Sequence, residues 1–289
     1  MSTVLIGCLY KKRGFIDGKY KFTYALLLLL QLLLGLHMLP FYTNTINEFI
    51  MQTSTTNSTL ELLQKTTNTP DILTALRNIS DAFPGGVIFS TSFSWEDQAI
   101  AHLIFSEQLP IEVFTLDTGR LFPETYSTWS STLDRYKERI TAYYPDAQLL
   151  QEFIAEKGPN SFYESVDNRK RCCFIRKVEP LQRALQGKQV WLTGIRAAHS
   201  PNRTDMTQIE WDASNNIAKY HPLLDWSTEE LKAFIALHNI PYNPLHDRGF
   251  VSIGCAPCTR AVKPGEDFRA GRWWWEDADK KECGLHVHK

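Results

Sequence analysis

Short apolar runs alternate with longer amphipathic segments from Met51 onward. Runs rich in β-branched and aromatic residues occur at Val87–Ser90, Ile111–Leu116 and Val190–Thr193. Each run is short and bounded by turn-forming residues, which is typical of buried strands. Helical segments separate the runs, and the chain shows no internal repeat. The alternation predicts the α/β fold class, with a parallel sheet flanked by helices.

Helical spacing is expected at Leu60–Leu63 and at Ile72–Ile79, ahead of the Pro84-Gly85-Gly86 turn. A further helix is expected from Gln98 to about Glu107. The sequence Ser227-Thr228-Glu229-Glu230 has the capping-box pattern, so it predicts a helix that extends to about residue 238. We assign this last feature a structural role and no catalytic one.

Polar loops follow each of the three predicted strands. They span Thr91–Asp97, Asp117–Arg120 and Gly194–Arg203. Ligands of open α/β sheets bind at the carboxyl ends of strands, so these loops are the expected binding site. A hydroxyl-rich loop that leads into a helix N-terminus suits an anion, although an ordinary capped turn fits the first loop equally well.

The composition is that of an ordinary soluble domain. The chain has 289 residues, of which 43% are hydrophobic and 22% are charged. Its 31 basic residues nearly balance its 32 acidic residues, which argues against general nucleic-acid binding. Basic residues nevertheless cluster locally, which suits a small polyanion, the alternative being a solvated surface balanced by carboxylates. The two clusters are Arg169–Arg171 with Arg176 and Lys177, and Arg260, Lys263, Arg269 and Arg272.

The first fifty residues differ from the rest of the chain. Basic residues precede a leucine-rich run over residues 25–41, which is short for a membrane-spanning helix and is interrupted by Gln31, Gly35 and Pro40. We expect residues 1–50 to be an extension upstream of the true start, with Met51 as the start. A genuine membrane anchor is the alternative; otherwise we expect a cytoplasmic protein without membrane contact.

Five cysteines outside that extension divide into two pairs and one single residue. Cys255 and Cys258 form a C-x-x-C pair, Cys172 and Cys173 are adjacent, and Cys283 stands apart near the end. Structural zinc sites usually space each pair by two or more residues, so the adjacent pair favours an iron-sulfur cluster over zinc. Disulfides are the third interpretation, disfavoured in a reducing cytosol.

Seven motifs together resemble those of the assimilatory adenylyl-sulfate and phosphoadenylyl-sulfate reductases. The resemblance runs in order from about Gly85 to His288 and leaves out residues 1–50. The matching motifs are Thr91–Asp97, Leu116–Arg120, Cys172–Leu181, Trp191–Arg196, Gly254–Arg260, Gly265–Trp273 and Glu282–His286.

The resemblance implies an adenine nucleotide α-hydrolase-like fold and a 4Fe-4S cluster. By family position the cluster is held by Cys172, Cys173, Cys255 and Cys258, and Cys283 is the nucleophile. It further implies thioredoxin-dependent reduction of adenylyl sulfate to sulfite and AMP, through an S-sulfocysteine intermediate, in assimilatory sulfate reduction. We expect a helical lead-in at 51–84, a nucleotide-binding and iron-sulfur domain at 85–270, and a mobile catalytic tail at 271–289.

Substrate-binding residues are also assigned by family position. They are Ser92, Ser94, Lys177, Arg203, Arg269, Arg272 and His286. Lys177 follows the cysteine pair by four residues, so one helical turn could place its ammonium group between the cluster and the substrate. We expect the cluster to tune the electrostatics of the site rather than to deliver electrons.

Other functions stay open. The same reaction on 3'-phosphoadenylyl sulfate is one alternative, because an additional cation near the ribose would admit the 3'-phosphate. An ATP-dependent adenylating relative is another, although it would normally carry a Ser-Gly-Gly-x-Asp-Ser loop where this chain has Ser92–Asp97. A non-enzymatic iron-sulfur sensor would leave Cys283 without a role. The chain could also form a homo-oligomer.

Overall fold

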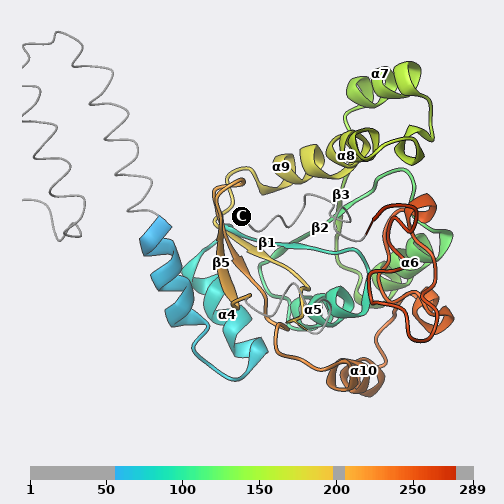
Figure 1. The fold of residues 1–289 in the computed structure, drawn as a ribbon. Helices are drawn as coiled ribbons and strands as arrows, with labels where there is room; N and C mark the ends of the chain where they lie inside the picture. Colours follow the sequence, from blue (N-terminus) through green and yellow to red (C-terminus); the bar gives the residue numbers. More distant parts are fainter. Residues whose placement is uncertain (1–55, 198–205, 278–289) are drawn as a thin grey trace, which may run out of the picture. The chain divides into compact units, whose positions relative to one another are not determined.

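The computed structural model describes residues 56–197 and 206–277, all within one compact unit. A six-stranded sheet lies between two layers of helices (Figure 1). The strands are β1 (Val87–Ser90), β2 (Glu112–Leu116), β3 (Thr141–Tyr143), β4 (Val190–Leu192), β5 (Ile209–Asp212) and β6 (Ile217–Tyr220). The helices include one at 56–66, α4 (Ile72–Ala82), α5 (Trp95–Ser106), α6 (Pro123–Tyr136), α7 (Ala147–Lys157), α8 (Val166–Cys173), α9 (Glu179–Leu185) and α10 (Thr228–Leu237).

The strand order is β3-β2-β1-β4-β6-β5. Ile88 of β1 pairs in parallel with Glu112 of β2 on one side and with Trp191 of β4 on the other. The chain therefore builds outward from β1 through β2 to β3 and then returns to place β4 on the opposite side of β1. The carboxyl ends of β1 and β4 mark the point at which this direction reverses, where ligands of open α/β sheets usually bind.

The predicted parallel sheet is confirmed, with one antiparallel strand at its edge. β5 and β6 pair antiparallel and are joined by residues 213–216, a connection too short for a parallel crossover. The predicted strands match β1, β2 and β4 to within one residue at each end. The sequence did not predict β3, β5 and β6, which are three or four residues long and carry several polar positions.

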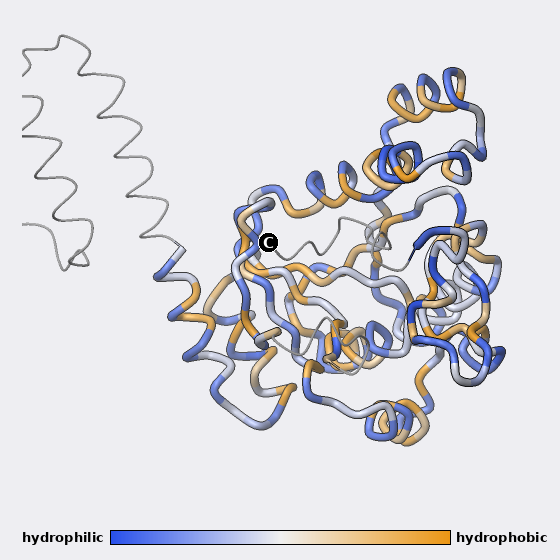
Figure 2. Tube along the Cα trace, in the orientation of Figure 1, coloured by the Kyte–Doolittle hydropathy of each residue, from blue (hydrophilic) through white to orange (hydrophobic). Residues whose placement is uncertain are grey.

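Alternate residues of β1 face two separate hydrophobic clusters. Val87 and Phe89 belong to the larger cluster, with residues of the helix at 56–66, α4, α5 and α10. Ile88 belongs to the smaller one, with Leu181 and Leu185 of α9. Apolar colouring runs along the central strands and in bands along the helices (Figure 2). The sheet is thus covered on both faces, as parallel sheets generally are.

Serine N-caps mark the first turns of α5 and α10. Ser94 caps α5, and its hydroxyl oxygen accepts a hydrogen bond from the Asp97 amide at 3.4 Å. The helix therefore begins at Trp95, three residues before the predicted start. The predicted capping box at the start of α10 is present in both directions, between Ser227 and Glu230.

The cysteine-bearing helix continues without a break from α8 through a π-helical turn, η2 (Phe174–Val178), into α9. Pro180 has no N–H to donate to the carbonyl group of Arg176, four residues earlier, so one α-helical hydrogen bond is absent next to this turn. π-Helical turns of this kind are frequent at functional sites.

Within the described ranges, no helix combines the length and the apolar content needed to cross a membrane. The apolar run at residues 25–41 lies outside those ranges.

Candidate active site

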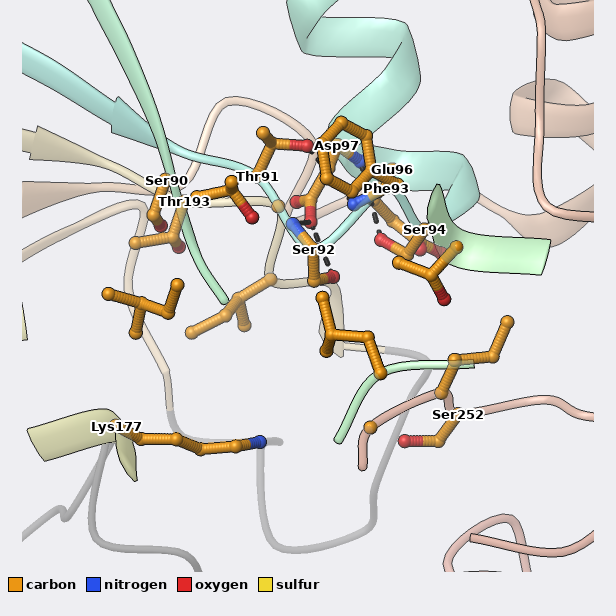
Figure 3. A pocket seen from close by; sticks show the side chains of 18 of the residues that line it. Ser90, Thr91, Ser92, Phe93, Ser94, Glu96, Asp97, Lys177, Thr193 and Ser252 are labelled. Carbon is orange, nitrogen blue, oxygen red and sulfur yellow. Dashed lines mark hydrogen bonds between the residues drawn. The ribbon is translucent and has the colours of Figure 1, made fainter. Parts of the chain in front are cut away.

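A cavity of about 250 Å³ lies at the carboxyl ends of β1, β2 and β4. All three predicted polar loops contribute to its wall, through Ser92, Thr118 and Gly194. Residues 251–254 close another side. The cavity thus occupies the edge of the sheet at which the strand order reverses (Figure 3).

The loop after β1 is held in shape by hydrogen bonds within it. Asp97 accepts hydrogen bonds from the Ser92 amide at 2.6 Å and from the Ser92 hydroxyl at 2.7 Å. Phe93 adopts a left-handed conformation with φ of 60°, and its buried ring stacks on Trp129 at a centroid distance of 5.6 Å. The loop is therefore fixed before any ligand binds.

Asp97 is a buried carboxyl group on the cavity wall. Burial raises its pKa to about 6, and the hydrogen bonds from Ser92 counteract only part of that effect. A Cβ atom added to Gly194 would lie 2.1 Å from Asp97 Oδ1, so the two segments meet without room for a methyl group. The neighbouring Glu96 forms a buried ion pair with Arg196, with Nε and Oε1 3.0 Å apart.

Positive charge reaches the cavity from two directions. Lys177, in the π-helical turn, extends toward it from the side opposite Ser92 and Asp97 (Figure 3). Arg269 contributes to the lining from the segment after Cys258. Arg272 lies behind the wall, where its Nη1 donates to the Ser252 hydroxyl at 3.3 Å and its guanidinium packs against Gly254.

A second, smaller cavity brings together four cysteines from two distant segments. Cys172 and Cys173 come from the end of α8. Cys255 precedes the short 3₁₀ helix η6 (Ala256–Cys258), and Cys258 is its last residue. The Ala256 amide donates to the carbonyl oxygen of Arg120 at 2.8 Å, which anchors this loop beside the one after β2. All four cysteines are free, so these thiols form no disulfide.

The chemistry of this cavity fits an anionic iron-sulfur cluster. Burial raises the pKa of Cys172, and it raises that of Cys258 to about 12. Thiols in such a place become thiolates only when a positive centre such as iron binds them. Four cations line the same cavity and could offset the charge of a thiolate-ligated cluster. They are Arg120, Arg169, Arg176 and Lys177.

Among the residues that the structure describes, no three cysteine, histidine or acidic side chains converge on a point that a single metal ion would occupy. A multi-iron cluster holds its cysteine sulfurs at separate corners, so its ligands stand farther apart than those of one ion.

The phosphoadenosine phosphosulfate reductase domain matches residues 86–261 of the chain. This chain belongs to that family. The match includes all three strands that form the cavity and both cysteine pairs.

Several adenosine 5'-phosphosulfate reductases are identical to the chain at about half of the aligned positions. An adenosine 5'-phosphosulfate reductase of Allochromatium vinosum is 50% identical over 200 residues, which are 69% of this chain and 78% of the relative. An adenosine 5'-phosphosulfate reductase of Agrobacterium fabrum is 49% identical over 203 residues, which are 70% of this chain and 78% of the relative. The crystal structure of phosphoadenylyl-sulfate reductase from Candida auris, at 29% identity, covers 70% of this chain and 96% of its own, with a TM-score of 0.59. The predicted family and fold are confirmed.

The structure groups most of the predicted reductase residues around the two cavities. Ser92, Ser94, Lys177 and Arg269 line the larger cavity, and Lys177 also lines the smaller one beside the four cysteines. Arg203, Cys283 and His286 lie outside the described residues. Substrate contact by these residues stays a prediction.

The two predicted basic clusters separate in the structure. Arg169 and Arg176 are buried at the cysteine cavity, whereas Lys170 and Arg171 are exposed. Arg260 forms an ion pair with Glu266 at 2.8 Å, and Lys263 is exposed, so both match the alternative of a balanced, solvated surface. Of the first cluster, Arg169 and Arg176 thus lie at the cysteine cavity.

Two features of the site were not predicted. Asp97 ends the Thr91–Asp97 motif but had no assigned role, because its burial depends on Gly194, far away in sequence. The buried ion pair of Arg169 with Glu276 joins residues 107 positions apart, and a basic run gives no sign of such a partner.

Proposed function

We propose that the chain reduces adenylyl sulfate, also called adenosine 5'-phosphosulfate, to sulfite and AMP in assimilatory sulfate reduction. We further propose that reduced thioredoxin supplies the electrons and that the reaction takes place in the cytoplasm, where thiols stay reduced. One observation carries the proposal: Lys177 lines both the cavity at the sheet edge and the cavity of four cysteines. Family membership and relatives named for this substrate support it.

The cavity at the sheet edge is where the nucleotide would bind. Its wall combines apolar surface from Leu116, Trp191 and Ile195 with backbone and hydroxyl groups of the loops after β1 and β4. Such walls suit a purine and a ribose. Lys177 and Arg269 would then face the phosphate and sulfonate groups, whose negative charges need nearby cations.

Cys283 would perform the chemistry as a nucleophile. Its thiolate sulfur attacks the sulfonate sulfur, the bond from that sulfur to the bridging oxygen breaks, and AMP leaves with the bonding electron pair. The product is S-sulfocysteine. A thiolate of reduced thioredoxin then attacks the Cys283 sulfur and expels sulfite, and the second thioredoxin thiol resolves the mixed disulfide. One dithiol is thereby oxidised to a disulfide for each sulfite formed.

The cations of the cavity would stabilise the leaving group. Negative charge develops on the AMP phosphate as the bond to sulfur breaks, and a fixed ammonium or guanidinium group lowers the energy of that state. That both Lys177 and Arg269 line the cavity supports this role.

Four thiols and four cations at the second cavity support a 4Fe-4S cluster as the resident cofactor. When bound, the cluster would supply a fixed charge beside Lys177 rather than redox equivalents. The residues of this chain hold it through Cys172, Cys173, Cys255 and Cys258 and offset its charge through Lys177 and the arginines of the wall.

The proposal is tested with protein that begins at Met51 and is purified without oxygen. Adenylyl sulfate and a known amount of reduced thioredoxin are added, and sulfite, AMP and remaining thiols are measured. We expect one sulfite and one AMP for each dithiol oxidised. Release of pyrophosphate from ATP, or the absence of sulfite, would contradict the proposal.

The same reaction on 3'-phosphoadenylyl sulfate is the second candidate, because the Candida auris protein that shares the fold is named for that substrate. The more similar relatives are named for adenylyl sulfate. Comparing kcat/KM for the two nucleotides decides between the candidates, and we expect the larger value with adenylyl sulfate.

A further inference from the structure

Arg169 is a buried cation that the reaction as proposed does not use directly. It lies in α8, three residues before Cys172, and its side chain is about 1% exposed. Its Nε and Nη2 atoms donate to the two carboxylate oxygens of Glu276 at 3.0 and 2.7 Å. The Glu276 side chain is about 4% exposed. Such a bidentate pair fixes both partners in position and orientation.

The segment that contains Glu276 is attached to the cysteine cavity at further points. The Trp273 amide donates to the carbonyl oxygen of Cys258 at 3.2 Å. Its indole ring is fully buried, and the guanidinium groups of Arg169 and Arg272 each lie 4.8 Å from its centroid. Arg169 therefore contacts both an aromatic ring and a carboxylate of the same short segment.

We propose that Arg169 is a positioning residue for the sulfonate transfer, because it fixes the point from which the end of the chain extends. Cys283 follows Glu276 by seven residues. Seven residues span at most about 25 Å, which is the longest reach of chain between the ion pair and the thiol. This inference depends on the proposed role of Cys283 as nucleophile.

The ion pair also links the two parts of the site. One end of α8 provides Cys172 and Cys173, and the same helix holds Glu276 through Arg169. A close tether raises the effective concentration of an attached group at its target. Without the ion pair the segment is still anchored at Trp273, ten residues before Cys283, so the longer tether is expected to slow the attack on the sulfonate without changing the chemistry of the thiol.

The test compares wild-type protein with Glu276→Gln and, as a matched control, Glu107→Gln. Glu107 takes part in an exposed ion pair with Arg77 that also joins distant segments, away from both cavities. Four quantities are measured: the single-turnover rate of sulfonate transfer to Cys283, the rate of Cys283 alkylation by iodoacetamide, the iron content, and the thermal unfolding.

We expect Glu276→Gln to slow sulfonate transfer about twofold, because effective concentration falls roughly as the −3/2 power of tether length, while the alkylation rate and the iron content stay as in wild type. Glu107→Gln is expected to change none of these three quantities. A purely structural role would lower the unfolding temperature without separating transfer from alkylation.

Two results would overturn the inference. The first is an unchanged transfer rate in Glu276→Gln, and the second is a transfer rate that falls only in proportion to lost iron. If Glu276→Gln does not fold, Glu276→Asp replaces it, because it keeps the charge but shortens the reach; the same two results then decide. Absence of any transfer in the wild-type protein would instead refute the proposed function.

Discussion

Lys177 is the residue at which the two cavities meet. Replacing it with alanine is expected to lower the rate of sulfonate transfer about 10²-fold, because the leaving phosphate loses a fixed positive charge. Single-turnover measurement of AMP release gives that rate. Lys170→Ala is the matched control, since Lys170 is an exposed lysine of the same helical segment. Equal rates for the two variants would contradict the role of Lys177.

The raised pKa of Asp97 leads us to expect a specific dependence of stability on pH. Its pKa is raised from 3.8 when unfolded to about 6 when folded, chiefly by burial. Between these values the folded state binds the additional proton. The stability that this group contributes is therefore fully present below pH 4 and lost as the pH rises through 6.

The measurement compares the free energy of unfolding of wild type and Asp97→Asn across this range. The difference, wild type minus variant, is expected to fall by about 2 kcal/mol between pH 4 and pH 7. The difference isolates the contribution of Asp97, because all other groups titrate in both proteins. A difference that does not change with pH would show that Asp97 titrates normally.

At the scale of single residues, residue types and their spacing predicted which side chains gather at the site. The spacing of Lys177 from the cysteine pair predicted a place between the cluster and the substrate. Lys177 lines both cavities, and its contact with a substrate stays a prediction. The role of Asp97 could not be predicted, because its pKa depends on burial. The separation of the basic clusters could not be predicted either, because the partners of Arg169 and Arg260 are set by the fold.

At the scale of elements, the close approach of β4 to α5 shapes the cavity at the sheet edge. Gly194 follows β4, and a Cβ atom there would meet Asp97 Oδ1 at 2.1 Å. Gly194→Ala is expected to destabilise the protein by about 1–3 kcal/mol, because the first turn of α5 must move away. It should also weaken AMP binding.

Urea unfolding and calorimetric titration with AMP measure the two effects of Gly194→Ala. Unchanged AMP affinity together with unchanged stability would mean that the loops after β1 and β4 do not form a common wall.

The regular elements were predictable where they are buried and long enough to carry a pattern. β1, β2 and β4 are apolar and central, so their sequences alone indicate strands. β3 has three half-buried residues and lacks such a pattern. The π-helical turn that presents Lys177 is a local adjustment inside one helix, and hydrophobic periodicity does not reveal it.

At the scale of the whole molecule, the fold brings together two cysteine pairs that are far apart in sequence. Cys173→Ser and Cys255→Ser are each expected to lose most of the bound iron and the visible absorbance, because a thiolate ligand is removed. Cys283→Ser is the matched control and should keep both. Iron analysis of anaerobically purified protein measures the difference. A full iron content in either ligand variant would contradict the assignment of the cluster.

The sequence indicated that these pairs act together but not how the chain joins them. The joining depends on α8 ending beside the loop after β2, where Arg120 holds Ala256. The sequence also did not predict that the segment from Cys258 to Glu276 folds back onto α8. The contact of this segment with α8 is stabilised by the buried Trp273 and by the buried ion pair of Arg169 with Glu276, whose partners are distant in sequence.

The central claim is that Cys283 takes up the sulfonate while the rest of the molecule binds the nucleotide and the cluster. Intact mass spectrometry tests it most directly, on protein that begins at Met51, incubated with adenylyl sulfate and no reductant. We predict a mass gain of about 80 Da, which is absent in Cys283→Ser and is removed by reduced thioredoxin. Iron-loaded, nucleotide-bound wild-type protein that shows no mass gain would contradict the account.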